Sequence, residues 1–141
     1  MNIPENYFEI ILNEFKDIQG LCESAETPDD ALYYFSALYG VLNRVMNFYC
    51  DPILVFMHQV LQSTHKAVSD RMGMPVKPGI TNNGVAEETW QKLFSYVPLL
   101  IESFAKKDEN EIRRMLQKFS NLSYAMTGNG RYLQLRDRLS L

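Results

Sequence analysis

The hydrophobic residues of this chain recur at alternating steps of three and four along most of its length. This spacing places their side chains on one face of an α-helix, whereas the strict alternation typical of strands is almost absent. Five segments have this spacing, and we expect a helix over each. The positions, segment by segment, are Phe8, Ile11, Phe15, Ile18 and Cys22; Leu32, Phe35, Tyr39, Leu42, Met46 and Tyr49; Leu54, Met57, Leu61 and Val68; Trp90, Leu93, Val97, Leu100 and Phe104; and Ile112, Met115, Phe119, Leu122 and Met126.

The second of these segments has a wider apolar face than the others, because a second hydrophobic stripe runs beside its first one. A surface helix normally carries one such stripe, so two stripes predict a helix that packs against neighbours on several sides. We therefore expect this helix to be central. Its second stripe consists of Tyr34, Leu38, Val41, Val45 and Phe48.

Two Pro-containing pairs mark possible helix starts in the first half of the chain. Thr27-Pro28 is typical of a start, with a capping hydroxyl followed by a proline in the first turn. Asp51-Pro52 has the same form, yet the hydrophobic spacing continues across it. The pair therefore marks either a tight corner between two helices or a kink in one helix that runs from Pro28 to about Met72. That single helix would be roughly 65 Å long at ~1.5 Å per residue. That length is too great for a compact chain of this size, so the corner is favoured.

The later breaks complete the predicted fold. Residues 73–83 form the longest non-helical segment, and Asp108 is expected to cap the fifth helix. Pro98 lies inside the fourth helix and should bend it. Gly128-Asn129-Gly130 ends the fifth helix, and residues 131–141 predict a short last one. We therefore predict an all-α fold over residues 1–141 as a single domain. It is an antiparallel, left-handed helical bundle of four to five long helices plus a short C-terminal helix.

The charge of the chain is small overall and unevenly placed. A net charge of −3 and a pI near 5.4 argue against a general binder of nucleic acids or anionic membranes. Residues 1–30 hold eight acids and one base, whereas residues 111–141 hold six bases and two acids. Either the helices at the two ends lie side by side and neutralise each other, which we favour, or copies associate head to tail or offer a basic arm to an anionic partner. The six bases are Arg113, Arg114, Lys118, Arg131, Arg136 and Arg138.

The first residues bear on the cellular location of the protein. They carry acids where a secretory signal needs bases, and no stretch of ~20 apolar residues could span a membrane. We expect a cytoplasmic protein with no membrane partner. Cys22 and Cys50 are expected at opposite ends of antiparallel helices, too far apart for a disulfide, and we expect both to be buried and inert.

The candidate chemistry is sparse. His58 and His65 are seven residues apart, so on a helix they share a face but lie ~10 Å apart along its axis and cannot both bind one metal ion. We predict no metal site and no cofactor. A polar helix face is the favoured interpretation of these histidines. The alternative is a ligand pocket near the Pro98 bend, in which Trp90 and Tyr96 complete the wall and His65 is the acid–base group.

Three functions are consistent with these patterns. The leading hypothesis is a non-catalytic helical interaction module that self-associates, as a dimer, through its aromatic-rich second helix. The second is a small-molecule-binding or enzymatic bundle with the pocket just described, although no catalytic motif is present. The third is a small subunit associated with nucleic acid through the six bases. The tyrosines proposed for the self-associating surface are Tyr33, Tyr34, Tyr39 and Tyr49.

Overall fold

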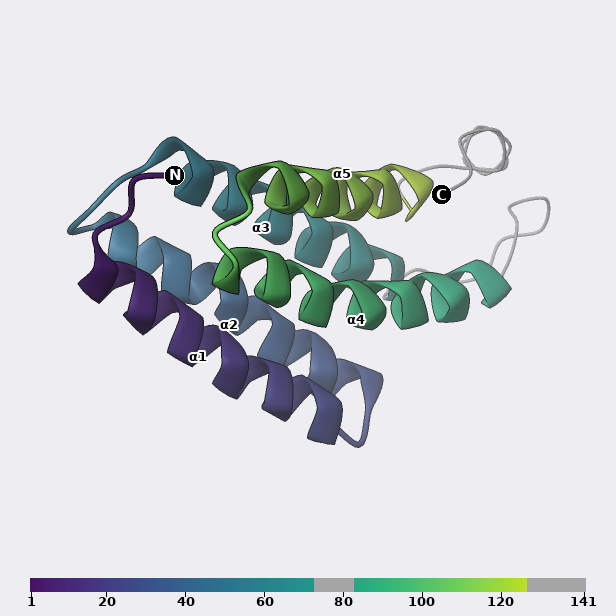
Figure 1. The fold of residues 1–141 in the computed structure, drawn as a ribbon. Helices are drawn as coiled ribbons and strands as arrows, with labels where there is room; N and C mark the ends of the chain where they lie inside the picture. Colours follow the sequence, from purple (N-terminus) through teal and green to yellow (C-terminus); the bar gives the residue numbers. More distant parts are fainter. Residues whose placement is uncertain (73–82, 127–141) are drawn as a thin grey trace.

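The computed structural model describes residues 1–72 and 83–126, and their side chains over residues 1–70 and 91–123. These residues form five helices and no strand, which confirms the all-α bundle (Figure 1). The helices are α1 (Glu5–Ser24), α2 (Pro28–Met46), α3 (Pro52–Met72), α4 (Asn83–Ala105) and α5 (Glu109–Met126). The predicted loop after α3, the glycine-rich stop after α5 and the short last helix lie outside the described residues. The left-handed supercoil stays a prediction.

The helix starts follow the predicted caps. The Thr27 hydroxyl oxygen accepts the N–H of Asp30 at 3.1 Å, and α2 begins at the following proline. The Asp51 carboxylate accepts the N–H of Ile53 at 2.9 Å. Because α2 ends at Met46 and α3 begins at Pro52, the junction is a corner between two helices, as favoured from the sequence. The capping role of Asp108 is confirmed too, since its carboxylate accepts the N–H of Glu111 at 3.1 Å.

The link between α4 and α5 is held by a left-handed residue. Lys107 has φ 55°, and its N–H bonds to the carbonyl of Phe104 at 3.0 Å while the next N–H, of Asp108, reaches Ser103 at 3.1 Å. This pair of bonds is the Schellman arrangement, in which glycine is the usual left-handed residue. The Lys107 ammonium lies 4.5 Å from the centre of the Phe8 ring and 2.8 Å from Glu5. The link is therefore fastened to the start of α1.

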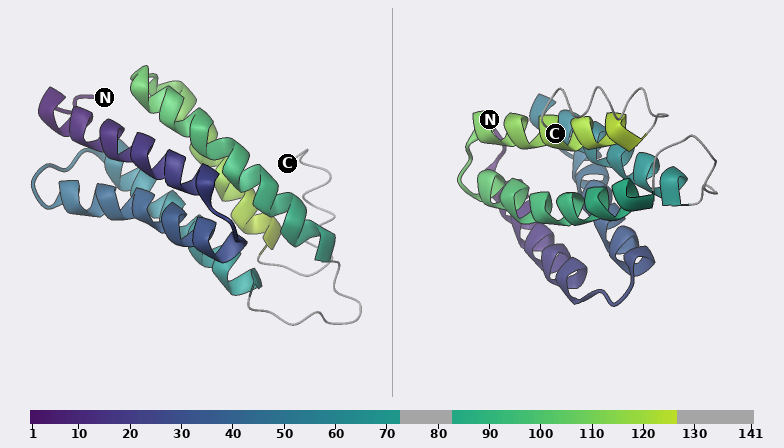
Figure 2. Two further views of the ribbon diagram at one scale, coloured as in Figure 1. Left: turned by 90° about the horizontal axis from the view of Figure 1, so that it is seen from below. Right: turned by 90° about the vertical axis from the view of Figure 1, so that its right-hand side faces the viewer.

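The five helices pack in the cyclic order α1, α2, α3, α5 and α4, with α4 returning to α1 and also touching α3. Figures 1 and 2 show α1 and α2 as one hairpin, with α4 and α5 as a second. Helices joined by short links are antiparallel, as predicted. The turn between α1 and α2 lies apart from α4 and α5 (Figure 2, right).

One neighbouring pair, α3 and α5, is parallel (Figure 1). Early in both helices, the Arg113 guanidinium lies 5.9 Å from the centre of the Phe56 ring. Two turns later, the buried Thr64 hydroxyl accepts from Ser123 at 3.1 Å and donates to the carbonyl of Val60 at 2.8 Å. A closed array of five helices cannot alternate in direction throughout, so one parallel pair is a geometric necessity. The sequence did not predict which pair this would be.

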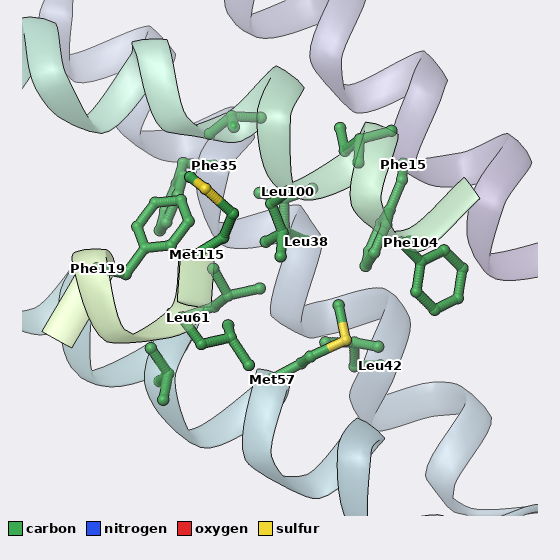
Figure 3. Close-up of a cluster of buried hydrophobic side chains, with 14 of the residues drawn as sticks. Phe15, Phe35, Leu38, Leu42, Met57, Leu61, Leu100, Phe104, Met115 and Phe119 are labelled. Carbon is green, nitrogen blue, oxygen red and sulfur yellow. The ribbon is translucent and has the colours of Figure 1, made fainter. Parts of the chain in front are cut away.

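The core is a single cluster to which all five helices contribute (Figure 3). The prediction that α2 is the central helix was wrong, because α2 packs mainly against α1 and α3, whereas α3 and α4 each pack against three helices. The buried residues of α2 come from both hydrophobic stripes rather than from one complete stripe. Phe48, by contrast, follows the end of α2 and has 79% of its surface exposed. α4 continues through Pro98 to Ala105, and its predicted bend stays a prediction. The buried residues of α2 are Ala31, Leu32, Phe35, Leu38, Val41, Leu42 and Val45.

The favoured interpretation of the charge distribution was wrong for α5, which is the part of the basic region that the structure describes. α1 packs against α2 and α4, whereas α5 packs against α3 and α4. α4 therefore lies between the acidic helix and the basic one. Their charges do not neutralise each other along their lengths. Among the residues described, no helix is long and apolar enough to cross a membrane.

Candidate functional site

The two histidines pack against α2. The ring of His65 stacks on Phe35 with centroids 6.3 Å apart and meets the edge of Tyr39 at 5.6 Å. His58 meets the same Tyr39 ring at 6.0 Å. Burial lowers the pKa of His65 below its ordinary value, and a hydrogen bond to the backbone of Leu32 opposes part of that change. These contacts are those of a histidine packed against aromatic rings.

The structure does not join the histidines to the other residues of the predicted ligand pocket. Tyr96 meets Phe119 of α5 edge to face at 5.8 Å, and Phe119 lies 6.1 Å from Phe35. Two core rings therefore stand between Tyr96 and His65. The side chain of Trp90 lies outside the described part. Within the described residues, no group of three His, Cys, Asp or Glu side chains could hold a metal ion.

The four tyrosines proposed as an interface divide into two pairs. Tyr39 packs between the histidines, and Tyr49 stacks on Tyr7 at 5.7 Å while its hydroxyl donates to the carbonyl of Asn2 at 2.6 Å. Both are held by contacts within the chain. Tyr33 and Tyr34 meet edge to face at 5.9 Å, and Tyr33 is 73% exposed. Of the four tyrosines only Tyr33, at the start of α2, is exposed, and Tyr34 is half-buried like Tyr39 and Tyr49.

The basic residues of α5 are engaged within the chain. Arg113 bonds to Glu109 at 3.0 Å, and the Nε of Arg114 donates to Glu111 at 2.9 Å. Lys118 lies 5.4 Å from the centre of the Tyr96 ring, on the side of α5 that faces α4, whereas Arg113 reaches Phe56 of α3. Lys118 and Arg113 therefore contact different neighbours of α5. The other three predicted bases, Arg131, Arg136 and Arg138, lie outside the described residues.

An open groove runs along the outer seam between α1 and α2 and has a volume of about 220 Å³. Ile10 and Phe48 are exposed at its rim. The ion pair between Glu14 and Arg44, with 2.7 Å between the charged atoms, bridges the two helices within it. The remaining lining residues are Tyr7, Val41 and Val45.

The apolar surface continues beyond the groove. Ile10, Glu14 and Leu21 are spaced by four and seven residues, so they share one stripe of α1. Tyr33 precedes Arg44 by eleven residues, or three turns, and shares its stripe of α2 in the same way. We call this surface, defined by Ile10, Leu21, Tyr33, Phe48 and the Glu14–Arg44 pair, the hairpin face. It holds four of the five large hydrophobic residues that are exposed among those described, the fifth being Leu99 of α4.

Sequence reasoning missed most of this surface. Ile10 and Leu21 lie outside the core stripe of α1. Their position was the available signal of an exposed apolar surface, because a large apolar residue on the polar side of a helix does not face the core. Phe48 continued a stripe of α2 and was therefore expected in the core. It is exposed because α2 ends two residues before it.

Known proteins provide no further guide to this surface. The chain matches no protein-family model, no curated protein and no solved structure.

Proposed function

We propose that this chain is a non-catalytic helical interaction module that self-associates, and that the hairpin face is its docking surface. The observation that carries the proposal is the concentration of exposed apolar side chains on one face, above all Phe48. Apolar patches of this kind on a small domain mark sites of contact with other proteins. The aromatic contribution of α2 comes from Tyr33 and from Phe48 just after the helix, in place of Tyr39 and Tyr49.

The energetics favour a moderate affinity. Fully burying one Phe, Leu or Ile side chain stabilises a contact by about 1.5–3 kcal/mol. The association of two molecules costs ~4–15 kcal/mol in lost freedom of motion. Four apolar anchors therefore supply a gain of the same order as this cost, and the expected behaviour is concentration-dependent association rather than a permanent complex. We propose the cytoplasm as its location, where the two unpaired cysteines would stay reduced.

Sedimentation velocity over a range of concentrations tests the proposal. The wild-type chain should form a larger species as concentration rises, and Ile10→Ser and Phe48→Ser should each shift it towards the monomer. Leu99→Ser is a matched control, because Leu99 is 45% exposed on α4 and Ile10 is 48% exposed on the hairpin face. Circular dichroism should show that all three variants keep their helices. A wild-type chain that stays strictly monomeric at high concentration overturns the proposal.

A further inference from the structure

The hairpin face is acidic as well as apolar. Asp17 lies on the same stripe of α1 as Ile10 and Leu21, and Glu26 and Asp29 flank the turn into α2. All three acids are exposed, and none makes an ion pair within the described part of the chain. The one base of the face, Arg44, is already bonded to Glu14. The surface therefore presents exposed carboxylates beside its apolar anchors.

This charge argues against contact between two identical hairpin faces. A two-fold contact would bring the acids of one copy against those of the other, and like charges placed together across an interface cost several kcal/mol. The occupant that fits must combine apolar side chains with bases.

One segment of the same chain has this pattern in its sequence. Tyr132, Leu135 and Leu139 are spaced by three and four residues, so in a helix they would form one apolar stripe. Arg136 would flank this stripe on one side, with Arg131 and Arg138 on the other side. The stripe would be about 10 Å long, and the stretch from Ile10 to Leu21 on α1 is about 16 Å long, at ~1.5 Å per residue.

We infer that the hairpin face takes up residues 127–141 of a second copy, which dock as a basic amphipathic helix. This inference rests on the proposed self-association and names its second surface. The apolar stripe of the segment packs on the groove and its arginines meet the free carboxylates, which is a helix-in-groove mode of recognition. Because the two surfaces differ, the contact is heterologous, and the smallest closed assembly is a dimer in which each copy takes up the other's segment.

A charge exchange in the full-length chain tests this pairing. The first variant carries Asp17→Lys and Glu26→Lys, and the second carries Arg131→Glu and Arg136→Glu. Each variant alone brings like charges together and should lower the association constant by more than about tenfold. An equimolar mixture should associate again, because each hairpin face then meets a segment of opposite charge. Sedimentation velocity on the separate and mixed variants measures the effect, with circular dichroism as the check on folding.

The outcomes separate the two proposals. If the second variant associates as strongly as the wild type, residues 127–141 are not the occupant, and the inference fails while self-association stands. If the mixture stays monomeric although both variants are folded, the pairing is also wrong. If the wild-type chain never associates, the proposed function fails together with the inference.

Discussion

Phe104 closes the helical array at the seam between α1 and α4. Its ring is fully buried, stacks on Phe8 with centroids 4.8 Å apart and meets the edge of Phe15 at 5.6 Å (Figure 3 shows the contact with Phe15). Phe104→Ala removes both ring contacts and leaves a cavity. We expect it to lower the free energy of unfolding substantially.

The size of the loss follows from these contacts. A buried Phe→Ala change costs about 3–5 kcal/mol, of which the two aromatic pairs account for ~0.5–1.5 kcal/mol each. Phe104→Leu keeps most of the volume and loses only the ring geometry, so it should cost about 1–2 kcal/mol. A domain of this kind is stable by ~5–15 kcal/mol, so both variants should fold.

Urea unfolding followed by circular dichroism measures the loss, with Phe48→Ala and Phe48→Leu as controls. The same substitutions at the exposed Phe48 should change the free energy of unfolding by no more than about 0.5 kcal/mol in dilute solution. Hydrogen exchange should also be faster in α1 of the Phe104→Ala variant, because this helix loses the ring contacts that pack it against α4. Equal losses at the two positions would refute the packing described for Phe104.

Three further measurements test individual residues. Lys107→Ala should be less stable than Lys107→Gly by about 1 kcal/mol, because both lose the ammonium contacts but only glycine adopts φ 55° without strain; equal stability in urea would contradict this. The pKa of His65 is lowered in the folded chain, so the unfolded chain takes up its proton first as pH falls. The contribution of His65 to the free energy of unfolding should be fully present above pH 6.5 and should decrease as pH falls through 6.5 towards the lower folded pKa. His65→Gln should therefore flatten that part of a plot of urea midpoint against pH. Burial raises the pKa of Cys22 to about 11, with Glu23 adding to the effect, so at pH ~8 a thiol reagent should modify the exposed Cys50 much faster than Cys22; equal rates of modification would refute this.

The local features of the fold were predictable because each depends on residues close in sequence. The Thr27, Asp51 and Asp108 caps each act within three residues, and the core stripes of α1 and α5 are properties of single helices. The order of helices around the core depends on which apolar faces fit together, and spacing along one helix does not contain that information. For this reason the separation of α1 from α5 and the parallel pair were not predicted.

The candidate surface was predicted only in part for a similar reason. Tyr39 and Tyr49 were assigned to an interface because the core was expected to be too small for them. The structure holds them with partners from elsewhere in the chain, His65 of α3 for Tyr39 and the Asn2 carbonyl for Tyr49. Cys50 was expected to be buried and is exposed, because it lies in the link after α2.

The odd number of helices in the described part of the chain has an electrostatic consequence. α1, α3 and α5 begin at the end of the molecule where α2 and α4 finish (Figure 1). Each helix carries roughly half a positive charge at its first turn and half a negative charge at its last, so the backbone dipoles of the described helices cannot cancel in pairs. The uncompensated negative pole lies at the end that holds the turn between α1 and α2. At the turn itself the last turn of α1 lies beside the first turn of α2, so their partial charges oppose each other and the local negative charge comes from Glu26 and Asp29.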